Sequence, residues 1–138
     1  MKKITSILIM ALFLHVSFAQ EKGINFKKDS FESILALAKK ENKLVFIDCF
    51  TVWCGPCKEL VKTVFPQEEV GSFFNDNFIS VAIDMEKGEG VELAQYYQID
   101  SYPTLLFVNS NGDLVTRSSG LIAASTLLEN AKIALDKK

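Results

Sequence analysis

The sequence predicts an α/β domain whose central mixed sheet has four to five strands, with helices on both faces. Three observations support this prediction. The run Leu44 to Phe50 is almost continuously apolar, which is typical of a central strand covered on both faces. Helical and strand-like apolar patterns then alternate along the chain, which favours parallel strands joined by helices. Asn111-Gly112, between two apolar runs, indicates an antiparallel hairpin that closes the sheet.

The first half of the chain contains strand and helix signals in alternation. Asp29 with Glu32 three residues later is typical of a capping box, and apolar residues follow at helical spacing. Phe65-Pro66 interrupts the helical periodicity after the central strand. The expected elements are a short strand over 24–26, a helix ending near 42, the strand over 44–50, a helix over 58–64 and a second short helix around 70–74.

The second half completes the sheet. A strand-like apolar run is followed by a glycine-containing loop and a helical pattern, then by the two arms of the hairpin and an amphipathic segment. The sequence contains no internal repeat or linker, so we expect a single domain. The expected elements are a strand over 78–84, a helix over 91–97, strands over 104–108 and 114–119, and a C-terminal helix through 127–135.

The N-terminus has the pattern of a cleavable signal peptide. Two lysines precede about thirteen apolar residues, and Ser17-Phe18-Ala19 follows as a cleavage site of small residues. A comfortable membrane span needs about twenty apolar residues, although an uncleaved N-terminal anchor is the alternative. We expect a signal peptide over 1–19, cleavage between Ala19 and Gln20, and a domain over 20–138 that is periplasmic or secreted.

Composition narrows the range of partners. Loss of Lys2 and Lys3 with the signal peptide changes the formal net charge from −2 to −4, and no basic stripe is visible. Nucleic acid is therefore not an expected partner. The acidic residues between 84 and 92 lack the spacing of a calcium-binding loop, so we interpret them as a solvated loop without metal. We expect no bound cofactor and a monomer.

The segment Cys54-Gly55-Pro56-Cys57 is the strongest functional signal. Two cysteines at this spacing form either a small, easily opened disulfide or half of a zinc site. Zinc needs further ligands, but the remaining candidates are Cys49 and His15, and His15 lies in the expected signal peptide. The motif also lies between a predicted strand and a predicted helix. These facts favour redox chemistry over zinc binding.

With these residues in place, the chain resembles the thioredoxin-fold family over nearly all of the expected mature sequence. Within that family it is most similar to exported, periplasmic-type thioredoxin-like proteins related to the C-terminal domain of DsbD, a membrane electron carrier. The resemblance implies a thioredoxin fold and a protein-disulfide oxidoreductase that acts on cysteines of other proteins. It rests on Asp48, the run Trp53 to Lys58, Tyr102-Pro103-Thr104, Gly112 and Gly120.

The two motif cysteines have distinct expected roles. Cys54 precedes a helix, where free N–H groups and the helix dipole stabilise a thiolate, so we expect it to be the nucleophile. Cys57 lies one turn further along and is expected to be the less exposed, resolving thiol. The alternatives are an inert buried cysteine at 54 and a purely structural disulfide between the pair.

Asp48 and Cys49 are neighbours on the central strand with opposite expected orientations. A carboxylate in an apolar strand is costly, so burial should raise its pKa and let it accept the proton of Cys57. The alternative for Asp48 is a hydrogen-bonded residue at a strand end. Cys49 should face the other side of the sheet as a core residue, or serve as a third redox thiol.

A substrate-binding surface is expected around Cys54. By resemblance, Tyr102-Pro103 forms a cis peptide that presents its backbone to an extended substrate, whereas a trans proline at a strand start is the alternative. Pro56 stiffens the motif turn. An apolar rim would dock protein substrates, or these residues are ordinary surface and core positions. The expected substrate-binding residues are Val52, Trp53, Gly55, Pro56, Tyr102, Gly120 and Leu121.

The direction of electron flow also follows from the resemblance. Gly55-Pro56 between the cysteines favours a reductant, recharged by a membrane electron carrier. Three departures from thioredoxin bear on the tuning of the site: Phe50 replaces a tryptophan, Ser80 replaces a lysine near the buried aspartate, and a helix-kinking proline is missing. The alternative functions are a disulfide oxidase or isomerase and a non-catalytic binding module.

Overall fold

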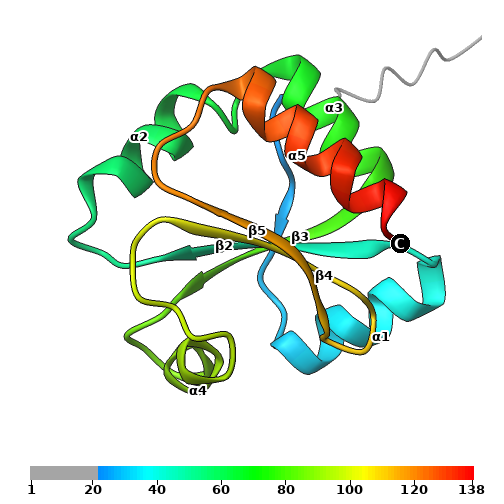
Figure 1. The fold of residues 1–138 in the computed structure, drawn as a ribbon, viewed down its shortest axis with the longest axis horizontal. Helices are drawn as coiled ribbons and strands as arrows, with labels where there is room; N and C mark the ends of the chain where they lie inside the picture. The colour runs from blue at the N-terminus through cyan, green and yellow to red at the C-terminus, as the bar shows by residue number, and fades with distance from the viewer. Residues whose placement is uncertain (1–21) are drawn as a thin grey trace, which may run out of the picture.

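A computed structural model describes residues 22–138, so the expected signal peptide and its cleavage site lie outside the described residues. A five-stranded sheet crosses the domain between two layers of helices (Figure 1). Within residues 22–138, no helix is long and apolar enough to cross a membrane.

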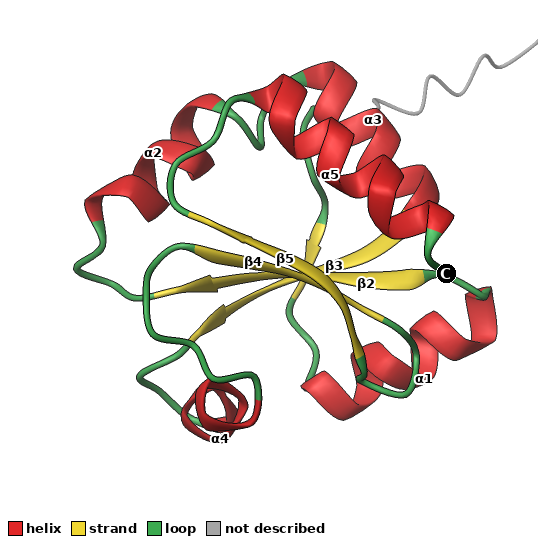
Figure 2. Cartoon of the chain, in the orientation of Figure 1, coloured by secondary structure: helices red, strands yellow, loops and turns green. Residues whose placement is uncertain are grey.

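The order of helices and strands agrees with the sequence pattern, and four of the strands have the predicted bounds (Figure 2). The elements are β1 (Phe26–Lys27), α1 (Phe31–Glu41), β2 (Leu44–Phe50), α2 (Gly55–Thr63), α3 (Glu68–Asn77), β3 (Phe78–Asp84), α4 (Glu89–Tyr96), β4 (Thr104–Val108), β5 (Leu114–Ser119) and α5 (Ala124–Asp136).

The sheet has the order β1-β3-β2-β4-β5, with β2 at its centre. β3 pairs in parallel with both β1 and β2, whereas β4 is antiparallel to β2 and to β5. The predicted combination of a parallel half and a closing antiparallel hairpin is therefore confirmed. Asp48 lies opposite Ala82 on one side and Leu105 on the other, in the middle of the sheet.

Each face of the sheet has its own apolar core. Helices α2, α3 and α5 cover one face, and α1 and α4 cover the other (Figure 1). Successive residues of β2 alternate between the two cores: Phe46 packs under α2, α3 and α5, whereas Val45 and Ile47 pack toward α1. Cys49 follows this alternation and packs with Val45 and Ile47. Asp48 must therefore face the side of the sheet that α2 covers.

The start of α1 differs from the sequence prediction. The N-cap of α1 is Ser30, whose side chain accepts a hydrogen bond from the Ser33 N–H, so the predicted capping box at Asp29 is wrong. Glu89, at the start of α4, accepts a further bond from the Phe31 N–H at 3.0 Å. The two residues are 58 positions apart in sequence, so the pattern of residues around α1 could not predict this bond.

Candidate active site

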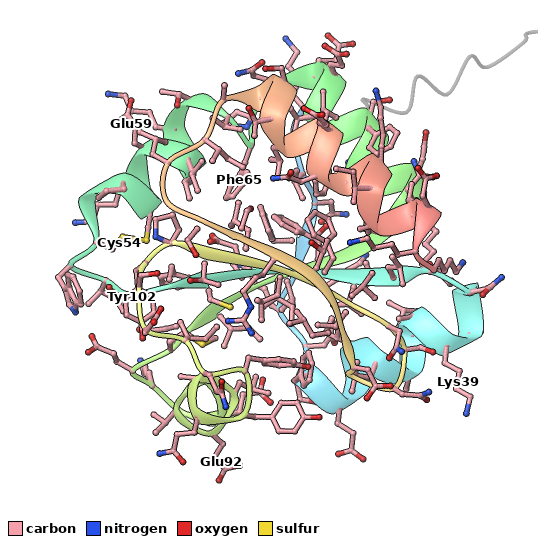
Figure 3. All side chains as sticks on the ribbon, in the orientation of Figure 1. Lys39, Cys54, Glu59, Phe65, Glu92 and Tyr102 are labelled. Carbon is pink, nitrogen blue, oxygen red and sulfur yellow. A yellow bond between two sulfur atoms is a disulfide. The ribbon has the colours of Figure 1, made fainter. Side chains whose placement is uncertain are left out.

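The cysteine motif lies where β2 ends and α2 begins, at the carboxyl end of the central strand (Figure 3). Cys54 is the N-cap residue of α2, and its Sγ accepts a hydrogen bond from the Cys57 N–H at 3.2 Å. Pro56 lies in the first turn of the helix, where its missing N–H leaves no bond unmade. The two sulfur atoms form a disulfide, with the Cα atoms 5.3 Å apart.

The exposure of the two cysteines does not follow the prediction. Cys54 is 2% exposed and Cys57 is 3% exposed, so the expectation that Cys57 is the less exposed thiol is wrong for the disulfide form. The reason is local: the Cys54 Sγ is bonded to Cys57 and caps its amide, which keeps it against the first helical turn. Gly55 and Pro56, on the outer side of that turn, are exposed.

Asp48 is buried without the hydrogen bonds that a strand-end aspartate would make. It is 2% exposed, and its Oδ1 has no partner among the described residues. Burial raises the pKa of this carboxyl to about 7. Asp48 and the expected resolving cysteine, Cys57, line the same cavity on the α2 side of the sheet.

Cys49 occupies the opposite face of the sheet, as predicted. It is a free cysteine, 1% exposed, and it packs in the apolar core with Ile34 and Leu106. Burial, and then the neighbouring Asp48 carboxylate, raise the pKa of its thiol. The interpretation as a core residue fits this environment, whereas a third redox thiol would need access to solvent.

We expect Cys49 to resist alkylation in the folded, reduced protein. Iodoacetamide should label Cys54, the expected nucleophile, after reduction. It should reach Cys49 only after unfolding in guanidinium, because the Cys49 thiol is buried and its thiolate is disfavoured. Mass spectrometry of the labelled peptides measures this. Labelling of Cys49 under native conditions would overturn the core interpretation.

The predicted cis peptide between Tyr102 and Pro103 is present, directly before β4. The Pro103 carbonyl accepts a hydrogen bond from the Gly120 N–H at 2.9 Å, which ties the segment after β5 to this loop. Figure 3 shows Tyr102 and Cys54 at the same end of the sheet. The structure therefore brings Tyr102, Pro103 and Gly120 to the motif end of the domain from segments distant in sequence.

The apolar residues expected to form a rim are largely at the surface. Val52 and Trp53 are about two thirds exposed, and Leu121 is about half exposed. The Trp53 and Tyr102 rings meet edge to face, with centroids 5.9 Å apart. The role of this rim in substrate binding remains a prediction.

Sequence reasoning missed two residues at this end of the sheet. Glu86 accepts a hydrogen bond from the Trp53 Nε1–H at 2.6 Å, and burial followed by this carboxylate raises the pKa of Tyr102. Thr51 is buried beside the motif, and its hydroxyl has no hydrogen-bond partner within residues 22–138. In the sequence, Glu86 was part of the acidic segment between 84 and 92, which we interpreted as a solvated loop. The sequence pattern did not single out Thr51. Residues 22–138 contain no group of three His, Cys, Asp or Glu side chains arranged to hold a metal.

The fold and the site define a class of protein: a thioredoxin-fold protein with a disulfide-forming cysteine pair at the start of a helix. Comparison with known families agrees, because the thioredoxin-like domain family matches residues 31–132. The chain belongs to the thioredoxin-like family.

Individual relatives show the same likeness. The chain is 33% identical over 113 residues to thioredoxin Y of Oryza sativa, a chloroplastic protein, covering 82% of this chain and 64% of that one. It is 32% identical over 108 residues to the thiol:disulfide interchange protein DsbD of Pseudoalteromonas atlantica, covering 75% of this chain and 18% of DsbD. The chain therefore spans less than two thirds of the length of these curated relatives.

A solved structure covers the chain more completely. A protein of Bacteroides thetaiotaomicron, described as a candidate disulphide isomerase, is 48% identical and superposes with a TM-score of 0.75. The match covers 87% of this chain and 99% of that one. A thioredoxin from Thermus thermophilus, 22% identical with a TM-score of 0.70, shares the fold.

Proposed function

We propose that this protein is a thiol–disulfide oxidoreductase that reduces disulfides of other proteins outside the cytosol. The observation that carries the proposal is the Cys54–Cys57 disulfide at the N-terminus of α2, with the buried Asp48 carboxyl in the same cavity as Cys57. The pair supplies two electrons, and Asp48 supplies a place for the proton that the second step releases.

The reaction has two exchanges. In the first, the Cys54 thiolate attacks one sulfur of the substrate disulfide, forms a mixed disulfide and releases the other substrate sulfur as a thiolate. In the second, the Cys57 thiol gives its proton to the Asp48 carboxylate and attacks the Cys54 sulfur. The Cys54–Cys57 disulfide forms, and the second substrate sulfur leaves as a thiolate. Two electrons pass from the pair to the substrate, and the released thiolates take up protons.

The substrates that fit this site are extended protein segments with accessible disulfides. The exposed Val52 and Trp53 side chains offer apolar contact, which favours protein segments of varied sequence. The backbone at Tyr102, next to the cis proline, is the expected site for pairing with an extended substrate strand.

The reducing direction predicts a low reduction potential. Equilibration of the Cys54–Cys57 pair with glutathione should give a value close to that of thioredoxin, about −270 mV. Acid trapping followed by mass spectrometry gives the fraction of oxidised protein, and this fraction gives the reduction potential. A Cys49→Ala variant ensures that only the Cys54–Cys57 pair contributes to the measurement. A value near that of DsbA, about −120 mV, would contradict the reducing direction.

An isomerase is the second candidate, because the Bacteroides relative is described as a candidate disulphide isomerase. Reactivation of ribonuclease with scrambled disulfides distinguishes the two functions. An isomerase restores ribonuclease activity when supplied in catalytic amounts, whereas a reductant supplied in excess over the ribonuclease disulfides leaves reduced ribonuclease.

Export of the protein, and reduction of its oxidised form by an electron donor, are further parts of the proposal. The charged and apolar pattern of residues 1–19 supports cleavage before Gln20, and N-terminal sequencing of the mature protein tests it, since an intact Met1 contradicts cleavage. An exported reductant needs electrons from across the membrane. The likeness to part of DsbD supports a membrane electron carrier as the donor.

A further inference from the structure

The Trp53 side chain connects three loops at the motif end of the sheet. Trp53 itself belongs to the loop between β2 and α2. Its Nε1–H donates a hydrogen bond at 2.6 Å to the Oε1 of Glu86, in the loop between β3 and α4. Its ring meets the ring of Tyr102, in the loop before β4, edge to face with centroids 5.9 Å apart. The indole is therefore held from two sides.

The indole is held in this way although it lies at the surface. Trp53 is 65% exposed. A surface side chain ordinarily moves between several rotamers, and water competes for its polar group. A hydrogen bond to a carboxylate is stronger than one between neutral groups. The bond to Glu86 therefore restricts a ring that would otherwise turn in solvent.

The loop that carries Glu86 is itself fixed to the sheet. The Glu86 N–H donates to the Asp84 Oδ1 at 3.0 Å, and the Met85 N–H donates to the Phe50 carbonyl at 2.9 Å, at the end of β2. Gly90 packs so closely against Asp84 that a Cβ at Gly90 would meet the Asp84 carbonyl oxygen at 1.9 Å. These backbone contacts place the Glu86 carboxylate independently of the indole.

The indole is the one partner of the Glu86 carboxylate within residues 22–138. No other side chain in that range donates a hydrogen bond to it. The ion pair of that range joins Lys43 to Glu41, so no cation neutralises Glu86. Removal of the Glu86 carboxylate therefore breaks a single side-chain contact, the bond to Trp53.

We propose that Glu86 is a positioning residue, which holds the Trp53 indole against Tyr102 so that the apolar rim around Cys54 is ordered before a protein substrate binds. A substrate that meets an ordered rim does not have to immobilise the indole, and binding loses less conformational entropy. Glu86 acts on substrate binding through Trp53 and not on the cysteine pair. This role rests on the proposed function, whereas the restraint of the indole does not.

The restraint is tested by NMR of the indole. Trp53 is the one tryptophan of the sequence, so the oxidised, ¹⁵N-labelled protein gives a single indole Nε1–H signal. Glu86→Ala should shift this signal and speed its exchange with water at least about threefold, because the bond is lost. Glu92→Ala removes an exposed carboxylate from α4 and should leave the signal unchanged. A signal that Glu86→Ala leaves unchanged would overturn the proposal.

A kinetic measurement separates substrate binding from the chemistry of the cysteines. The reduced protein is mixed with insulin, or with hydroxyethyl disulfide, which is too small to cover the rim, and acid quenching gives the rate constant of the first exchange. Glu86→Ala should lower the rate constant for insulin about three- to tenfold, the cost of ordering one side chain on binding. The rate constant for hydroxyethyl disulfide and the reduction potential should not change. Equal slowing with both disulfides would refute a role in substrate binding.

Two further variants separate the hydrogen bond from the charge. Glu86→Gln keeps an oxygen acceptor without the charge, so its rate constant for insulin should stay within about twofold of the original value. Trp53→Phe keeps an aromatic ring without the N–H donor. In that background Glu86→Ala should have no further effect, because Glu86 acts through the indole. Further slowing in the double variant would overturn the proposal.

Failure of this role and failure of the proposed function give different results. An original protein that leaves insulin oxidised contradicts the proposed function. An original protein that reduces insulin at the same rate as Glu86→Ala overturns the role of Glu86 and leaves the proposed function intact.

Discussion

Replacing Cys54 by serine is expected to reduce insulin-reducing activity to the background rate of the dithiothreitol in the assay. Serine leaves no thiolate at the helix N-terminus to attack a disulfide, and the remaining Cys57 is a buried resolving thiol. The rate of insulin precipitation measures this. The control variant Cys49→Ala should retain activity, because Cys49 lies on the other face of the sheet.

The complementary change at Cys57 should stop the reaction halfway. Cys57→Ala leaves the first attack intact and removes the second, so mixed disulfides with Cys54 accumulate and identify the substrates. Capture from cells by affinity purification, followed by reduction and mass spectrometry, gives the partners. Activity that survives Cys54→Ser, or the absence of trapped partners with Cys57→Ala, would favour the non-catalytic binding module.

Replacing Asp48 by asparagine is expected to change how stability depends on pH. The carboxyl has a pKa of about 7 in the folded protein, against an ordinary value of 3.8. The folded state therefore binds more protons than the unfolded state between these two values, and stability falls as the pH rises through that window. Across this window the free energy of unfolding falls by about 4 kcal/mol, and above about pH 8 it falls no further on account of Asp48.

Urea unfolding of the oxidised proteins from pH 4 to pH 9 measures this effect. The free energy of unfolding of Asp48→Asn, relative to the original protein, should rise across the window by about 4 kcal/mol. Asp76→Asn removes an exposed carboxylate from α3 and controls for the change in net charge. Parallel pH curves for Asp48→Asn and the original protein would show that Asp48 does not titrate in this range.

The same variant should slow the second exchange selectively. Without the carboxylate, the Cys57 proton has no acceptor in the cavity, so resolution of the mixed disulfide should slow about a hundredfold. In the original protein, this step should become faster as the pH rises through about 7, because only the ionised carboxyl accepts a proton. Rapid acid quenching and mass spectrometry separate the two steps. Equal slowing of both steps, or none, contradicts this role.

Most of the sheet could be predicted because its signals are local. The strands over 44–50 and 78–84 are apolar runs long enough to be buried on both faces, and the hairpin strands flank an Asn-Gly turn. Helix starts were less accurate. Ser30 caps α1 in place of Asp29, and α2 begins at Gly55 because Cys54 acts as the cap. Several polar residues in a row offer competing caps, and their local pattern does not decide between them.

The parts of the site that were missed depend on contacts between distant segments. The Glu86 carboxylate reaches the Trp53 indole across 33 residues, and the cavity forms where the segment at 22–26 meets α2 and the sheet. A local residue pattern does not show which distant segments lie in contact.

The sequence by itself determined the fold class, the cysteine pair as the reactive group and the opposite orientations of Asp48 and Cys49. Each depends on chemistry and periodicity within a few residues, which a strand or a helix start carries with it. Only the tertiary structure decided that Asp48 and Thr51 line an open apolar cavity with Cys57. Burial and missing hydrogen-bond partners are properties of the packed chain, because they depend on which distant segments exclude water from a side chain.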